Sequence, residues 1–108
     1  MAKYVMIAQS AAKEGRDEEY SAWYDATHLP EICSLPGVIS GRRLQATPIA
    51  MPTPGAKYIT LYEIETDDIG AVMAEMGRRV QAGEQAQTDS LDRDAAVLWV
   101  YADMNPEA

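Results

Sequence analysis

The most informative segment of the sequence is Tyr20-Ser21-Ala22-Trp23-Tyr24-Asp25-Ala26-Thr27-His28-Leu29-Pro30-Glu31. Its aromatic residues and the only histidine of the chain recur at the i, i+3, i+4, i+7, i+8 spacing, which is the pattern of one helix face. Asp17 is a candidate N-cap. We expect the helix to end at His28, because Pro30 restricts the residue before it and lacks a backbone donor. Pro30 then begins a short turn over residues 31–34.

Strand signals surround this helix along the chain. Four short runs rich in strand-forming residues are predicted strands, at residues 3–9, 38–47, 57–65 and 95–102. A second helix is predicted to begin at Asp67-Asp68 and to end at Gly83, with Glu75 placed to pair with Arg78 or Arg79. Its apolar stripe comprises Ile69, Val72, Met73, Met76 and Val80. The Pro-rich passage 48–55 and the polar passage 84–94 are predicted loops, and the tail 103–108 is expected to fray.

The order strand, helix, strand, strand, helix, strand predicts an α+β fold. In 108 residues it fits a single ferredoxin-like βαββαβ domain, with a four-stranded antiparallel sheet and two helices on one face. The last strand is apolar on both faces, so the face without helices needs a cover. We assign to that face Tyr4/Met6, Tyr58/Tyr62 and Trp99/Tyr101. A homodimer that closes face to face is the simplest cover; the alternative is that Trp99 and Tyr101 are partly exposed edge residues.

Composition limits the classes of partner. With 9 basic and 17 acidic residues the formal charge is −8, and the basic residues are scattered, which opposes nucleic-acid and anionic-membrane binding. The single cysteine, Cys33, excludes an internal disulfide and fits a reducing compartment. The N-terminal residues lack a signal-peptide layout, and no run approaches the roughly 20 apolar residues of a membrane span. We expect a cytoplasmic protein whose partner is a small molecule or another subunit.

Three motifs together resemble a known superfamily. Trp23-Tyr24-Asp25-x-x-His28-Leu29-Pro30, then Leu35-Pro36-Gly37-Val38 and Arg42-Arg43-Leu44, resemble the dimeric α+β barrel superfamily, and within it the EthD-like group. The resemblance implies a homodimer whose two sheets close into a barrel, with a small-molecule cavity between each sheet and its helices or at the barrel mouth. Relatives of this kind include cofactor-free monooxygenases of quinone-like substrates, cyclases, isomerases, haem-binding enzymes and proteins resembling dehydratases. The fold therefore assigns no single reaction.

His28 is the first candidate for a catalytic group, because an imidazole titrates near neutrality and can both accept and donate a proton. Asp25 lies three residues earlier on the same predicted helix, where its carboxylate would accept a hydrogen bond from one ring nitrogen and leave the other for a substrate. The alternative is that His28 only caps the helix end, bonding a last-turn carbonyl.

The candidate substrate-binding residues are Tyr20, Trp23, Tyr24, Arg42, Arg43, Tyr58 and Tyr62. The aromatic residues of the helix either line a pocket or form core, and for Trp23 core is favoured. Tyr58 and Tyr62 share a strand face, suited to a flat substrate or to dimer packing. The two arginines project to opposite faces, so at most one reaches a given cavity, where it would stabilise an enolate or carboxylate. Surface ion pairing is the favoured alternative for each.

We expect no metal and no cofactor. The chain has one histidine, and Pro30 disturbs the geometry that would bring Asp25, His28 and Glu31 together. Haem held by His28 is a less favoured alternative, and Cys33 is expected to be a buried, inert thiol.

The preferred function is a cofactor-independent acid/base enzyme, a dehydratase, lyase, cyclase or isomerase, acting on a hydrophobic or aromatic oxygenated small molecule. Two alternatives stay open: a non-catalytic dimeric binding protein for a hydrophobic metabolite, and a cofactor-free monooxygenase.

Overall fold

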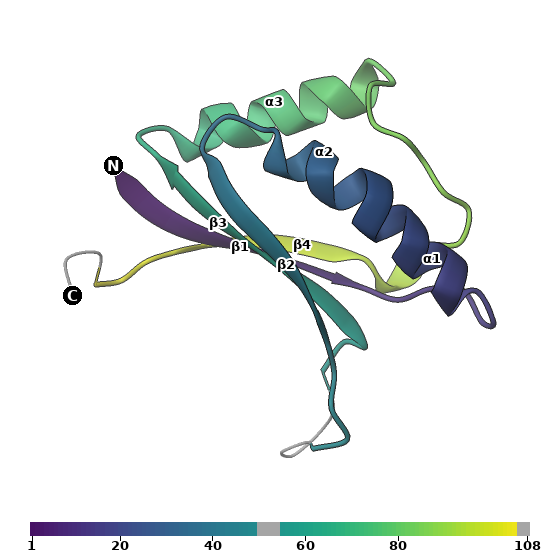
Figure 1. Ribbon diagram of the computed structural model, residues 1–108. Helices are drawn as coiled ribbons and strands as arrows, with labels where there is room; N and C mark the ends of the chain where they lie inside the picture. Colours follow the sequence, from purple (N-terminus) through teal and green to yellow (C-terminus); the bar gives the residue numbers. More distant parts are fainter. Residues whose placement is uncertain (50–54, 106–108) are drawn as a thin grey trace.

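The computed structural model describes residues 1–49 and 55–105, and its centre is one four-stranded antiparallel sheet. The strands are β1 (Ala2–Ser10), β2 (Val38–Gln45), β3 (Tyr58–Thr66) and β4 (Val97–Ala102), in the spatial order β2-β3-β1-β4. All the longer helical elements lie on one face of this sheet (Figure 1). They are α1 (Asp17–Trp23), the π-helical turn η1 (Tyr24–His28), α2 (Leu29–Cys33) and α3 (Ile69–Gln81). The predicted ferredoxin-like α+β class is confirmed.

Most element bounds agree with the sequence pattern to within two residues. The last strand begins at Val97 and not at Ala95, because the 3₁₀ turn η2 (Arg93–Ala95) occupies the residues before it. The predicted loop 48–55 falls largely on residues 50–54, and the end of the predicted tail falls on residues 106–108; both segments lie outside the described residues. Within residues 1–49 and 55–105, no helix has the length and apolar character needed to cross a membrane.

The first helix does not end at His28, so that prediction is wrong. The chain passes from α1 through the π turn η1 into α2, and the Leu29 N–H donates to the Tyr24 carbonyl, five residues back. Pro30 lacks an N–H, and in a regular α-helix its ring would collide with the carbonyl four residues earlier. A widened turn directly before Pro30 relieves that collision. The helix therefore continues to Cys33 around a π turn instead of stopping.

Asp17 does not cap this helix, which corrects a second expectation. The N-cap residue is Arg16, which makes no side-chain capping bond. The Asp17 carboxylate instead accepts hydrogen bonds from Lys57 Nζ and Tyr58 Oη, each at 2.6 Å. These bonds hold the pKa of Asp17 below its usual value. The residue thus ties the start of α1 to the start of β3.

Helix α3 follows its predicted signals. The Asp68 carboxylate accepts a hydrogen bond from the Ala71 N–H at 3.1 Å, which caps the N-terminus. Gly83, just beyond the C-terminus, has a φ of +71°, a left-handed conformation that suits glycine at a helix stop. Glu75 pairs with Arg78 at 2.7 Å and with Arg79 at 2.9 Å, as the spacing predicts.

The two faces of the sheet differ from the assignment made on the sequence. Met6 pairs with Tyr62, and both are buried under the helices, as is Tyr58, while Tyr4 is partly buried against the same core; these four residues do not belong to the uncovered face. The main core cluster comprises Met6, Ile32, Leu35, Tyr62 and Ile64. A second cluster comprises Tyr20, Tyr24 and Tyr58. The two tyrosines of β3, Tyr58 and Tyr62, are therefore core residues on which the helices pack.

The uncovered face is built by the alternate positions of the same strands. Trp99 pairs with Ile7, and Tyr101 pairs with Val5, so these four side chains share a face. Trp99 is 63% exposed and Tyr101 is 53% exposed. This uncovered face carries no helix in Figure 1. Of the three residue pairs that the sequence analysis assigns to the uncovered face, only Trp99/Tyr101 lies there.

Candidate functional site

Two adjoining cavities lie between the sheet and the helices. The aromatic cavity, of about 340 Å³, is lined by Tyr20, Trp23, Tyr24 and His28 among others. The methionine cavity, of about 440 Å³, is lined by Met6, Met73 and Met76 among others. The residues common to both linings are His28, Val80, Gln85 and Leu98. Each volume falls in the range of small-molecule sites.

His28 lies on the boundary between the two cavities and is held by aromatic contacts. Its ring stacks on the Trp23 indole, with 4.9 Å between centroids and an interplanar angle of 17°. Tyr24 meets the same ring edge-on at 4.9 Å. Residues five apart lie on different faces of an α-helix, but the wider π turn brings Trp23 and His28 onto one side. The π turn is thus the local cause of the stack.

Three polar atoms at this site are buried without a hydrogen-bond partner among the described residues. They are Trp23 Nε1, His28 Nδ1 and Gln85 Nε2, and all three residues line the aromatic cavity. A buried polar atom without a partner costs about 1–3 kcal/mol, so folded proteins contain few of them. Three such atoms on residues that line one cavity make it the candidate ligand site.

Burial lowers the pKa of the His28 imidazole below its ordinary value, and the Glu31 carboxylate opposes this only in part. The ring is therefore neutral at neutral pH. A neutral imidazole has one nitrogen that accepts and one that donates. His28 can accordingly accept a proton from a molecule in the cavity.

Asp25 is not brought to His28, contrary to the expected pair. Its carboxylate is 64% exposed and accepts a hydrogen bond from Arg43 Nη1 at 3.2 Å. The π turn places more residues in one turn than an α-helix does, which rotates position 25 away from position 28. What holds the imidazole is the stack on Trp23. His28 also does not cap a helix end, because the helix continues past it.

The two arginines of β2 do point to opposite faces. Arg42 pairs with Leu61 on the uncovered face, while Arg43 pairs with Thr60 and reaches under the helices. The Arg43 guanidinium lies 4.8 Å from the ring centroid of Tyr24 and within 5.6 Å of those of Tyr20 and Tyr58. Arg43 lines neither of the two cavities. Its position is that of a cation packed on aromatic rings.

The four tyrosines among the predicted site residues are mainly structural. Tyr20 bonds Ser10 through its hydroxyl, and Tyr24 bonds Tyr62 at 3.1 Å. Burial raises the pKa of Tyr62 well above its usual value. Tyr58 is bonded to Asp17. Tyr20 and Tyr24 still present their ring surfaces to the aromatic cavity, whereas Tyr58 and Tyr62 do not line it.

The sequence pattern predicts a polar loop at Gln85 and does not identify this residue as part of a site. Gln85 is only 9% exposed. Its neighbour Ala86 donates its N–H to the Glu31 carboxylate of α2 at 3.2 Å, which fixes this segment against the first helix. No periodic pattern marks a single buried glutamine between two elements, so only the tertiary structure identifies it.

Metal-ligating groups do not gather at this site. Across residues 1–49 and 55–105, no three His, Cys, Asp or Glu side chains lie close enough to hold an ion. Glu31 faces Ala86, and Asp25 faces Arg43. Cys33 is partly buried, and burial raises the pKa of its thiol.

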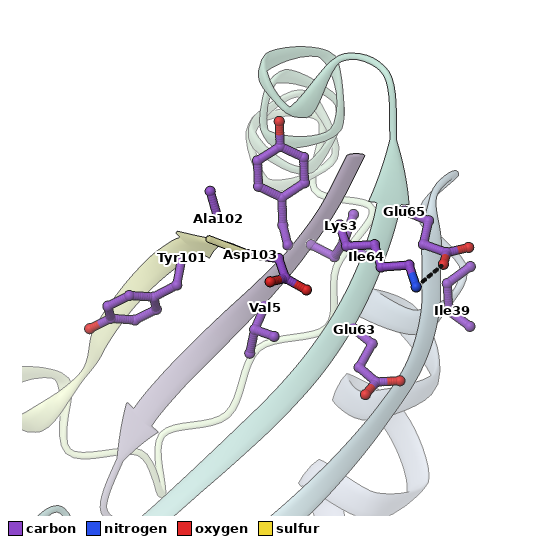
Figure 2. A pocket seen from close by; sticks show the side chains of 10 residues that line it. Lys3, Val5, Ile39, Glu63, Ile64, Glu65, Tyr101, Ala102 and Asp103 are labelled. Atoms are coloured by element: carbon purple, nitrogen blue, oxygen red, sulfur yellow. Dashed lines mark ion pairs between the residues drawn. The ribbon is translucent and has the colours of Figure 1, made fainter. Parts of the chain in front are cut away.

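These cavities differ in the charge of their linings from a hollow of about 400 Å³ on the uncovered face. That hollow is lined by Lys3, Glu63, Glu65 and Asp103 together with Val5 and Tyr101 (Figure 2). Lys3 and Glu65 form an ion pair there at 3.9 Å. In contrast, the described residues that line the aromatic and methionine cavities include no Lys, Arg, Asp or Glu.

Comparison with solved structures finds this fold in the crystal structure of a protein from Shewanella loihica described as a "putative monooxygenase". The two structures align with a TM-score of 0.62 over 95% of each chain, at 16% sequence identity. At this identity the likeness establishes the shared fold alone. No family model matches the sequence, and no curated protein matches it.

Proposed function

We propose that this chain is an enzyme that moves a proton on a hydrophobic, oxygenated small molecule, with His28 as the base and acid. The observation that carries the proposal is the neutral, buried His28 Nδ1, which has no partner among the described residues and borders both cavities. A general base must lie within hydrogen-bonding reach of the proton that it abstracts. A ligand in the cavity would supply that proton.

In the proposed reaction, His28 takes a proton from a C–H beside a carbonyl group or from an O–H. Negative charge then develops on the substrate oxygen, where Trp23 Nε1–H and Gln85 Nε2–H would donate hydrogen bonds. The imidazolium returns the proton to a different carbon, which isomerises the substrate, or to a departing hydroxyl group, which leaves as water. In a cyclisation, the enolate carbon first attacks a second carbonyl group of the substrate, and the imidazolium then protonates the oxygen of that carbonyl. Trp23 and Gln85 take the role for which the sequence analysis considered one of the two arginines. The chemistry requires no cofactor.

The test uses 2-acetylnaphthalene as an enolisable probe in D₂O. We expect the protein to accelerate exchange of the methyl protons for deuterium, followed by NMR, and His28→Ala to lose this acceleration while keeping its circular dichroism. Asp25→Asn is the matched control, because Asp25 faces Arg43, and it should exchange at the wild-type rate. Equal exchange by wild type and His28→Ala would contradict the proposal.

A second candidate, a cofactor-free monooxygenase, is favoured by the description of the Shewanella loihica protein. It would share the first step: His28 removes the proton of a phenol or quinol. Molecular oxygen then adds to a ring C–H carbon of the electron-rich anion to give a hydroperoxide, and loss of water from that hydroperoxide leaves one oxygen atom as a new carbonyl group. Oxygen consumption with 1,4-dihydroxynaphthalene, above the uncatalysed rate and lost in His28→Ala, is the result that would favour it over a lyase or isomerase.

We also propose that the chain is a homodimer of the dimeric α+β barrel kind, related to the EthD-like group. The apolar part of the uncovered face, where Trp99 and Tyr101 are more than half exposed, supports this assembly. The motif residues Trp23, His28 and Pro30 build the π turn and the stack, which gives the EthD-like motif a structural role in the site.

A further inference from the structure

The linings of the two cavities are unusual in charge. Charged residues make up 24% of the chain, yet none is among the described residues that line the aromatic and methionine cavities. The one ionisable group at their boundary is His28, and burial keeps its ring neutral. A ligand in these cavities therefore meets no formal charge.

This absence of charge selects against ionic ligands. Moving a carboxylate or phosphate out of water is costly unless a cation compensates it. The Arg43 guanidinium, which packs on the rings of Tyr20 and Tyr24, is already bonded to Asp25 at 3.2 Å and to Ser21 at 3.3 Å. Arg43 lines neither cavity, so it cannot serve as the counter-ion there.

Trp23 Nε1 and Gln85 Nε2, the two donor atoms of the aromatic cavity without a partner among the described residues, indicate which chemical group of a ligand would bind here. An indole Nε1–H is a donor only, and the Gln85 Nε2 amide also donates. Both therefore require an acceptor, such as a carbonyl oxygen. The methionine cavity offers Met6, Met73 and Met76, whose flexible side chains adapt to apolar shapes.

From these features we infer that the site selects uncharged carbonyl compounds. The carbonyl oxygen accepts hydrogen bonds from Trp23 Nε1 and Gln85 Nε2, and the apolar remainder lies in the methionine cavity. Gln85 is thereby a specificity-determining residue. This inference rests on the proposed function, because it names the substrate class of the same cavity.

The test compares three probes that share a naphthalene ring: naphthalene, 2-acetylnaphthalene and 2-naphthoate. Dissociation constants at pH 8 are measured from the Trp23 indole N–H signal in NMR titrations, assigned by comparison with Trp99→Phe. We expect the ketone to bind about tenfold more tightly than naphthalene, which is the effect of one net hydrogen bond. The naphthoate should bind more weakly than naphthalene.

Gln85→Ala should lose most of the tenfold preference for the ketone and keep the affinity for naphthalene, whereas Gln45→Ala, outside both cavities, should change neither. Tighter binding of 2-naphthoate than of the ketone, or equal loss of ketone and naphthalene affinity in Gln85→Ala, would overturn the inference. Binding needs no proton transfer. Ketone preference without deuterium exchange would contradict the proposed function alone, and absence of any ketone binding would overturn both.

Discussion

The His28 imidazole stacks on the Trp23 indole at 4.9 Å and 17°, although the two residues are five positions apart in one helix. Regular α-helical geometry would not place them together, and the π turn that does so lies directly before Pro30. The proline is therefore linked to the site through the backbone: it widens the turn, and the widened turn aligns the ring that borders both cavities.

The free energy of unfolding should depend on pH because His28 is largely buried in the folded state. Its pKa is lowered in the folded state, so below about pH 6.5, the ordinary imidazole value, the unfolded chain binds the proton first and the folded state loses stability as pH falls. The loss is at most about 1.4 kcal/mol per pH unit. Between pH 7.5 and 5, the melting temperature should fall more steeply for the wild type than for His28→Phe, which keeps a ring at this position. Identical pH dependence of the two melting temperatures would show that the imidazole is not buried.

Arg43 and Arg42 are neighbours with opposite surroundings, so the same substitution should have different effects. Arg43→Met removes the guanidinium from three tyrosine rings and from Asp25, and should lower the free energy of unfolding by about 1–3 kcal/mol. Arg42→Met, whose side chain is exposed on the single chain, should lower it by less than Arg43→Met does. Urea denaturation measures both. A cost at Arg42 equal to that at Arg43 would contradict the assigned faces.

Two glycines should respond to alanine with opposite signs. A Cβ on Gly41 would lie 2.7 Å from the Tyr62 ring and 2.9 Å from Cys33 Sγ, so Gly41→Ala should destabilise the fold by about 1–3 kcal/mol. Gly77 lies inside α3 with nothing within 4 Å of that position, and Gly77→Ala should stabilise by about 0.5–1 kcal/mol. The free energy of unfolding in urea tests both. A neutral Gly41→Ala would show that β2 is not packed tightly on Tyr62.

The uncovered face should hold a second copy of the chain. Sedimentation at micromolar concentration is expected to give a dimer for the wild type. Trp99→Arg places a charge in the apolar part of this face and is expected to give a folded monomer. Ala74→Arg, on an exposed position of α3, is the control and should remain dimeric. A monomeric wild-type protein would contradict the proposed assembly.

Sequence periodicity was sufficient for the architecture. Element order, the cap at Asp68, the stop at Gly83 and the Glu75 ion pairs follow from local signals that the tertiary structure does not override. Pro30 misled the prediction, because proline usually ends or kinks a helix and a π turn is a less common solution. The sheet faces were misassigned because both faces of the strands are apolar, so alternation alone does not say which one receives the helices.

The candidate site was recovered only in part. Tyr20, Trp23, Tyr24 and His28 line one cavity, as a stripe on a helix face predicts. The pairing of Asp25 with His28 required regular helical geometry, which the π turn breaks. Gln85 comes from a loop between α3 and η2, and its burial depends on contacts far away in the sequence, which no local pattern records.

An NMR titration of the only imidazole in the protein tests whether His28 exchanges protons with a molecule in the cavity. We predict a pKa below 6.5 for the free protein, and a further decrease when 2-naphthol is bound, because its O–H donates to the neutral ring. A pKa at or above 6.5 that does not change while 2-naphthol shifts the Trp23 signal would contradict the account.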